Sequence, residues 1–467
     1  MSNSSKASLP KDTSLRHRLA AGMERFANRH QDLYLIIAAL AVLAGYAYLA
    51  LFPIFAIGTF QAGVQLAQAP AGSGTWPMVA GYALVSAVLL FISLRIARMD
   101  YPEVKGLPIE RRYAPELFSV IEETQQYYKY PSFSDIVLSD RHEMQIRETP
   151  ILGLPFWTHK SLIIGLPYLQ LLSPKHFRCE LARLLARQTR HGSRTTSQMY
   201  RAHNIWLQYH EAFDRRHRLG DFPLRWFAKF YTPLLGLVVL PALRLNELAA
   251  DNAAQAHINE QDLLETIKQQ FINELFIKTQ YWPKIRKMAL HNPHQALEPS
   301  SKLEGVAQAA LAKIDRRQWL EMGYAYLHSP EDLKPDLRQR LDNLGQRNLD
   351  EPPLVKASAA GLYLRHNKAE LCRSIDALWR SSTVPKWIND RKDRRHNVEA
   401  IVQLSKKSYR QRLGFKEMLE YAHLAKALQG DSYYRSFRKL IKRNVKQPGQ
   451  RQAAAREQEE ARLRNVF

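Results

Sequence analysis

The chain has 467 residues, with 67 Lys or Arg against 44 Asp or Glu, so its formal net charge is +23 and its length predicts two to four structural units. A composition of 46% hydrophobic and 24% charged residues excludes a wholly disordered or collagen-like chain. Two cysteines, Cys179 and Cys372, are too few for a disulfide framework or a four-thiolate zinc site, which favours a reducing compartment.

Residues 33 to 94 form an uncharged run of 62 residues, far longer than a core helix of a soluble protein. One membrane span needs about 20 apolar residues, so the run holds two spans, at about 33–57 and 76–94. Residues 61–74 between them (QAGVQLAQAPAGSG) are rich in turn-forming types. The first span is too long, and starts too late in the chain, for a cleaved signal peptide. We therefore expect a transmembrane hairpin over residues 33–97.

The orientation of this hairpin follows from its basic flanks, because cytoplasmic flanks carry an excess of Lys and Arg. The connecting loop has no basic residue, whereas cations stand on both outer sides: Lys6, Lys11, Arg16, Arg18, Arg25 and Arg29 before it, and Arg95, Arg98, Lys105, Arg111 and Arg112 after it. We expect an integral membrane protein with a basic cytoplasmic N-terminal segment (1–32), and with both termini and the main domain in the cytoplasm. The basic remainder would lie beside anionic membrane lipids.

The remaining chain predicts a mostly α fold with a small β-sheet (α+β). An amphipathic helix is expected from about Tyr101 to Tyr130, and strands at Asp135–Leu138 and Ser161–Ile164, with helices beyond Ser173. Residues 98–350 form the main domain, 351–447 a basic helical C-terminal region and 448–467 a flexible tail. Residues 230–243 are apolar but short and contain two prolines, which favours a buried or membrane-surface helix over a third transmembrane pass.

A helix is predicted to begin at Ser173-Pro174 and to end at Gly192, because serine caps helix N-termini and proline suits the first turn. Phe177, Leu181, Leu184 and Leu185 form its apolar stripe. Arg187 precedes His191 by four residues, so the two side chains are expected to be neighbours on one face.

These segments resemble the membrane-anchored zinc metallopeptidases of the CAAX prenyl protease and HtpX type, which are gluzincins. The resemblance covers roughly residues 100–350 and rests on SLIIGLPYLQLLSP (161–174), LLARQTRHGS (184–193), NELAAD (246–251) and the closing segment Ser329–Gly345. In that family the helix carries His-Glu-x-x-His, and a downstream Glu-x-x-x-Asp supplies the third zinc ligand and a supporting aspartate. The resemblance implies these last two roles for Glu247 and Asp251, and a metallopeptidase-like domain over 98–350.

The sequence departs from this pattern at the catalytic positions. Aligning His191 with the second histidine of the motif puts Arg187 at the first histidine and Gln188 at the glutamate that activates water. Arginine has no lone pair for a metal and glutamine cannot act as a base, so no catalytic residue is intact. His191 and Glu247 remain as residual ligand positions. We hypothesise that Arg187 takes the space of the zinc and pairs with Glu247, and with Asp251 as well.

An alternative interpretation is that Arg187, Gln188 and His191 are simply a polar helix end and that Glu247 is an exposed acid. A second alternative is an active zinc metalloendopeptidase with substitute ligands such as His203 or His210, which would need zinc as its cofactor.

The leading hypothesis is a membrane-anchored pseudopeptidase that acts as a binding or regulatory module and has no cofactor. Its groove would accept an extended peptide beside Ser161, Leu162, Ile163 and Ile164 by strand addition, since that requires no metal. A third hypothesis is a membrane scaffold that recruits partners through the basic helical C-terminal region 351–447, in which Arg435–Lys446 forms a basic amphipathic helix. The expected partners are membrane lipids and a protein or peptide; nucleic acid is not expected, because no defined nucleic-acid-binding module accompanies the basic helix.

Overall fold

The structure is a computed structural model that describes residues 15–68, 75–189, 193–215, 221–291, 297–326 and 329–410, with a few single positions between 413 and 424. The chain divides into two compact units, one formed by Met1–Ile277 and Ser300–Ile375 and the other by Lys278–Pro299 and Asp376–Phe467. This division differs from the predicted boundary at residue 350. Residues 1–14, the basic segment Arg435–Lys446 and the tail 448–467 lie outside the described residues.

The first unit contains three N-terminal helices, a small sheet and most of the remaining helices. Its first elements are α1 (Leu15–Arg29), α2 (Gln31–Gln68), α3 (Thr75–Ala97), β1 (Leu107–Pro108), the 3-10 helix η1 (Arg111–Tyr113), α4 (Pro115–Tyr128), β2 (Asp135–Ser139), β3 (Met144–Ile151) and β4 (Leu154–Gly165). The central helices are α5 (Leu166–Leu171), α6 (Pro174–Gln188), α7 (Arg194–Asp214), α8 (Phe222–Gln255) and α9 (Glu260–Phe276).

The later elements are shorter, apart from the last helix. They are the π-helix η2 (Ile277–Tyr281), α10 (Trp282–His291), α11 (Pro299–Leu311), α12 (Arg316–Ala325), α13 (Leu337–Asn343), α14 (Ala359–Tyr363), the 3-10 helix η3 (Arg365–Asn367) and α15 (Lys368–Arg410). The expectation of a mostly helical chain with a small β-sheet is therefore confirmed.

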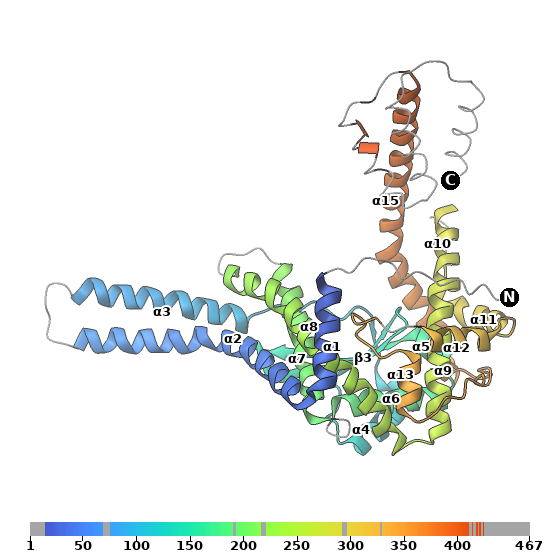
Figure 1. Cartoon of the computed structure of the whole chain (residues 1–467), viewed down its shortest axis with the longest axis horizontal. Helices are drawn as coiled ribbons and strands as arrows, with labels where there is room; N and C mark the ends of the chain where they lie inside the picture. The colour runs from blue at the N-terminus through green and yellow to red at the C-terminus, as the bar shows by residue number, and fades with distance from the viewer. Residues whose placement is uncertain are drawn as a thin grey trace. The chain divides into compact units, whose positions relative to one another are not determined.

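Helices α2 and α3 lie side by side as an antiparallel hairpin (Figure 1). The Ser86 hydroxyl donates to the carbonyl oxygen of Ala56 across the hairpin (2.9 Å). The prediction of a turn over 61–74 is wrong for its first part, because α2 stays helical to Gln68. Among the described residues, three helices are long and apolar enough to cross a membrane, namely α2, α3 and α8.

The sheet has the strand order β1-β2-β4-β3. β2 pairs with β4 in parallel. β3 pairs with β4 in antiparallel register from Met144 opposite Ile164 to Pro150 opposite Thr158, after which the register shifts and Ile151 lies opposite Leu154. The two predicted strands are present, and β4 extends further toward the N-terminus than predicted. β3 was not predicted, since its Arg147, Glu148 and Pro150 break the β-like composition.

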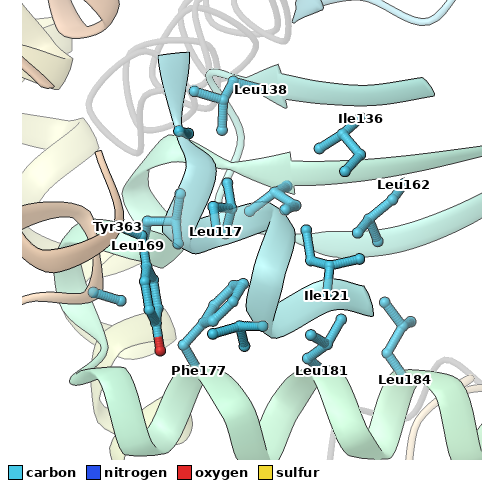
Figure 2. Close-up of a cluster of buried hydrophobic side chains, with 14 of the residues drawn as sticks. Leu117, Ile121, Ile136, Leu138, Leu162, Leu169, Phe177, Leu181, Leu184 and Tyr363 are labelled. Carbon is cyan, nitrogen blue, oxygen red and sulfur yellow. The ribbon is translucent and has the colours of Figure 1, made fainter. Parts of the chain in front are cut away.

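The main hydrophobic core lies between the sheet, α4 and one side of α6. Figure 2 shows Phe177, Leu181 and Leu184 pointing from α6 toward side chains of α4, β2 and β4. All three are at most 4% exposed. The helix begins as predicted, because the Ser173 hydroxyl accepts the backbone N–H of His176 and Pro174 follows it. Because the apolar stripe of α6 packs against the sheet and α4, the opposite side of the helix faces away from the sheet.

A second core joins α7 and α8 to the first half of α2. The Tyr34 hydroxyl donates to the Val238 carbonyl oxygen (3.0 Å) and accepts the N–H of Ala242 (2.9 Å). The Tyr231 hydroxyl donates to the Ala41 carbonyl oxygen (2.6 Å). Residues 230–243 thus lie within α8, which continues through Pro233 and Pro241 and has half of its apolar window covered by protein.

The second unit contains a hydrophobic cluster of Val398, Ile401, Leu413 and Tyr421 and a set of aromatic contacts. Trp282 stacks on Trp379, whose ring makes an edge contact with Trp387 (centroids 6.0 and 5.3 Å apart). The Tyr281 hydroxyl donates to the Pro299 carbonyl oxygen. Residues 278–299 are grouped with the C-terminal part of the chain in this division.

Candidate charge cluster between α6 and α8

The side of α6 that faces away from the sheet carries Glu180, Arg183 and Arg187, spaced by three and four residues. α8 presents Glu247 and Asp251, spaced by four. Both spacings place the side chains on one face of their helix. The arginines of α6 therefore face the carboxylates of α8.

Arg183 is the central residue of this contact. Its Nε donates to Asp251 Oδ1 and its Nη1 to Glu180 Oε1, the latter at 2.5 Å. Its Nη2 lies 3.6 Å from Glu247 Oε2. One guanidinium group therefore contacts three carboxylates from two helices.

Arg187 lies one turn further along α6. Its Nη1 donates to Glu247 Oε1, and its guanidinium carbon lies 4.7 Å from the centre of the Tyr200 ring on α7. The contact with the ring is a cation–π arrangement, which the exclusion of water strengthens. Arg187 thus joins α6 to both α7 and α8.

Arg340 on α13 closes the cluster from the other side of Asp251. Its Nε and Nη2 donate to the two carboxylate oxygens of Asp251, at 2.9 and 3.1 Å, as a bidentate pair. We call Glu180, Arg183, Arg187, Glu247, Asp251 and Arg340 the charge cluster. None of the six side chains is more than 13% exposed, and the formal charges of three guanidinium groups and three carboxylates cancel.

Burial and ion pairing act against each other at Glu247, which belongs to the charged end of α8 beyond its apolar part. Burial alone would raise the pKa of this carboxyl group. The guanidinium groups of Arg187 and Arg183 outweigh burial and lower the pKa to about 2. Glu247 is therefore ionised throughout the physiological pH range.

Hydrogen bonds to neighbouring helices fix the C-terminal end of α6. The carbonyl oxygen of Arg187 accepts from the Ser197 hydroxyl (2.9 Å) on α7 and from the Asn246 amide (3.1 Å) on α8. The Asn246 side-chain oxygen in turn accepts from the Thr196 hydroxyl (3.1 Å) and lies 3.1 Å from the Ser197 hydroxyl oxygen. The last carbonyl groups of a helix lack partners within it, so these polar side chains satisfy one that is partly buried.

The structure brings together some of the residues that the sequence singled out. Arg187 and Glu247 form an ion pair, as hypothesised, whereas Asp251 pairs with Arg183 and Arg340 and not with Arg187. Glu247 is buried and ion-paired, which removes its interpretation as an exposed acid. Gln188 is also buried, and its Oε1 has no hydrogen-bond partner among the described residues.

The predicted extent of this helix is wrong. α6 ends at Gln188 and not at Gly192, because Thr189 has extended backbone (φ −110°, ψ 174°). His191 lies outside the described residues.

The predicted peptide groove is wrong as well. Ser161, Leu162, Ile163 and Ile164 belong to the central strand β4, which is paired with β2 on one side and with β3 on the other. No backbone edge is free there for an added strand, and all four residues are buried. At the neighbouring strand β3, the Gln208 amide on α7 already donates to the Glu148 carbonyl oxygen (2.9 Å).

Sequence reasoning missed Arg183, Glu180 and Arg340. The spacing of Arg183 four residues before Arg187, and three after Glu180, was a usable signal, because it places all three on one helix face. Arg340 belongs to the segment Ser329–Gly345 that carried part of the resemblance, but nothing in its spacing indicates Asp251 as its partner.

The charge cluster does not suit a divalent metal. A zinc ligand must offer a lone pair, and the cluster offers guanidinium groups opposite carboxylates that already accept their hydrogen bonds. Among the described residues, no three His, Cys, Asp or Glu side chains come together in a way that could hold a metal ion. Of the suggested substitute ligands, His203 is buried where α7 packs near Gly236 of α8, and His210 lines a separate cavity.

Comparison with known proteins finds no family model, no curated protein and no solved structure that matches this chain.

Replacing Arg187 by alanine should lower the free energy of unfolding by about 3–5 kcal/mol, because it leaves the buried Glu247 carboxylate without its main partner. Chemical unfolding in detergent would measure the loss. Arg317→Ala is the matched control, since its ion pair with Glu321 is exposed and its loss should cost no more than about 0.5 kcal/mol. Removing Glu247 together with Arg187 should restore part of the stability. Equal stability of Arg187→Ala and the natural protein would contradict the pairing.

The stabilisation from Glu247 should vanish in acid. Its pKa is 4.5 in the unfolded chain and about 2 in the folded one, so the contribution is complete above pH 4.5 and is lost as the pH falls toward 2. The stability difference between the natural protein and Glu247→Gln, measured by denaturant unfolding, should shrink by about 2 kcal/mol between pH 7 and pH 3. A stability difference between the two proteins that stays constant with pH would show that ionisation of the Glu247 carboxyl group does not stabilise the fold.

Proposed function

We propose that this protein is a membrane-anchored relative of the zinc metallopeptidases that has lost the metal chemistry and acts as a binding or regulatory module. One observation carries the proposal. Two arginines spaced by four residues on α6 face a glutamate and an aspartate spaced by four on α8. A gluzincin places two histidines and two acids in the same relation, with zinc among them.

The contacts suggest a different alignment with the family motif from the one that the sequence alone favoured. The helical pair that faces Glu247 is Arg183 and Arg187, so the counterpart of His-Glu-x-x-His would be Arg183-Leu184-Leu185-Ala186-Arg187. This alignment lies one turn earlier than the alignment that uses His191. Both histidines would then be replaced by arginine.

Under this alignment the position of the catalytic base is held by Leu184. That side chain is 4% exposed and packs into the hydrophobic core under α4 (Figure 2). An aliphatic side chain can neither accept a proton nor orient water. Activation of water for peptide hydrolysis is therefore unsupported in either alignment.

Membrane anchoring is part of the proposal. α2 and α3 supply the hairpin, and the basic residues on its two outer flanks favour cytoplasmic termini and a cytoplasmic main domain. The scaffold hypothesis rests on the basic C-terminal region 351–447, of which the segment Arg435–Lys446 lies outside the described residues. The alternative of substitute zinc ligands has no described cluster in its favour.

Zinc content of rebuilt sites tests the proposal. We expect Arg183→His/Arg187→His to take up about one zinc per chain, because two histidines four residues apart on one helix would join Glu247. The natural protein and Arg187→His/Gln188→Glu should take up none. Elemental analysis of detergent-purified protein measures the content, and a thermal melt of each variant establishes that it is folded.

The other outcomes separate the alternatives. Near-stoichiometric zinc in the natural protein would overturn the proposal in favour of an active metallopeptidase with substitute ligands. Zinc in Arg187→His/Gln188→Glu alone would restore the alignment through His191. Folded variants that all lack zinc would show that the two helices are not a former zinc site.

A further inference from the structure

Exposed apolar side chains gather at the base of the hairpin, at the end of α3 that carries Arg95. One group lies at the tip of the β3–β4 hairpin, where Leu152, Phe156 and Trp157 are 54%, 80% and 52% exposed. Aromatic residues this exposed lose the stabilisation that burial would give them. Large apolar side chains left exposed close together on a folded domain usually mark a contact with another surface.

The backbone of the tip makes this placement more unusual. Leu152 and Gly153 connect β3 to β4, and both have positive φ (53° and 67°). Glycine and asparagine suit such positions, whereas a leucine there is strained by its side chain. Burial of the Leu152 side chain does not compensate for this backbone strain, since more than half of the residue is exposed.

The tip is held against α3. A Cβ atom on Gly153 would lie 2.5 Å from the Ile96 carbonyl oxygen, so the two backbones are in close contact. The Tyr209 hydroxyl donates to the Gly153 carbonyl oxygen (2.9 Å) and fixes the tip from α7. The apolar tip therefore lies beside the C-terminal end of α3.

A second apolar group, at the start of α8, lies at the same level. Arg95 on α3 forms a two-bond ion pair with Asp221, which precedes α8 (3.0 and 2.9 Å). The next residues facing outward, Phe222 and Trp226, are 67% and 60% exposed. They stand one turn apart on one face, beside the stripe of α8 that contacts α2.

Cations accompany this second group. Arg225 and Lys229, together with His210 and Asp214, line a cavity of about 330 Å³ whose remaining wall is formed by Phe222 and Trp226. Aromatic rings next to Arg and Lys are the residue types typical of the boundary between lipid tails and headgroups. The basic side chains also complement an anionic lipid surface.

We infer that Leu152, Phe156, Trp157, Phe222 and Trp226 form a membrane collar, which embeds in the headgroup region of the bilayer around the base of the hairpin. This inference rests on the proposed anchoring by α2 and α3. The 23 residues of α3 measure about 34 Å at about 1.5 Å per residue, which matches a hydrocarbon core of about 30 Å. The end of α3, and the collar beside it, then lie at the bilayer surface.

Lipid is the occupant that the geometry favours over a protein. The collar continues the exposed apolar surface of the hairpin, which reaches the same level through Phe91 and Leu94 of α3. A partner protein bound there would compete with the bilayer into which the hairpin inserts.

Spin labels on the full-length chain in phosphatidylcholine–phosphatidylglycerol nanodiscs test the collar. Single cysteines are introduced as Phe156→Cys and Trp226→Cys, with Leu84→Cys on α3 as the membrane reference and Leu362→Cys on α14 as the exposed control. The natural cysteines are both buried. Power saturation with oxygen and with a water-soluble nickel complex reports the depth of each label.

We expect both collar labels to favour oxygen over nickel, at depths between those of the Leu84 and Leu362 labels. Collar labels as accessible to nickel as the Leu362 label, with the Leu84 label embedded, would overturn the collar and leave the anchoring intact. A Leu84 label open to nickel would overturn the anchoring itself. Collar labels shielded from both reagents and broadened by spin–spin contact would indicate a second copy of the chain in place of lipid.

Discussion

The position of α6 depends on a balance of buried charge. Its apolar stripe packs on the sheet and α4, and its opposite side carries Arg183 and Arg187 into a space that the carboxylates of α8 share. Burying an unpaired charge costs several kcal/mol, so each arginine is acceptable only with its acid in place. Arg340 extends the same condition to α13, because Asp251 needs both of its guanidinium partners to satisfy its oxygens. The charge cluster therefore sets how three helices fit together.

The same balance limits what this region can do chemically. A zinc ion is exchangeable and polarises water, whereas a guanidinium group is permanently protonated, fixed to its helix and unable to accept an electron pair. With Glu247 held ionised by Arg187 and Arg183, neither a free base nor an open ligand position remains at the cluster. This limit supports the proposed role as a binding or regulatory module. The surfaces available for that lie away from β4, whose two edges are both occupied.

The sequence predicted those features that local chemistry determines. The uncharged run indicated the hairpin, and Ser173-Pro174 indicated the start of α6, because capping involves only neighbouring residues. The end of α6 could not be predicted, since hydrogen bonds from Ser197 and Asn246 to the Arg187 carbonyl replace the missing helical ones. The ion-pair partner of Asp251 could not be predicted from the sequence either. Whether it meets Arg183 or Arg187 depends on how α8 is placed along α6, which tertiary packing decides. The eight residues 61–68 continue α2 although their composition is typical of a turn.

The coupling energy between Arg183 and Asp251 measures whether the charge cluster holds α6 to α8. A double-mutant cycle would compare the unfolding free energies of the natural protein, Arg183→Ala, Asp251→Ala and the double variant, all in the same detergent. Each single variant removes the direct contact between Arg183 and Asp251, while Arg340 still pairs with Asp251 and Glu180 still pairs with Arg183. Because the two groups interact directly, the two losses should fall short of additivity by at least about 1 kcal/mol. Losses that add to within about 0.5 kcal/mol would contradict a charge cluster that holds α6 to α8.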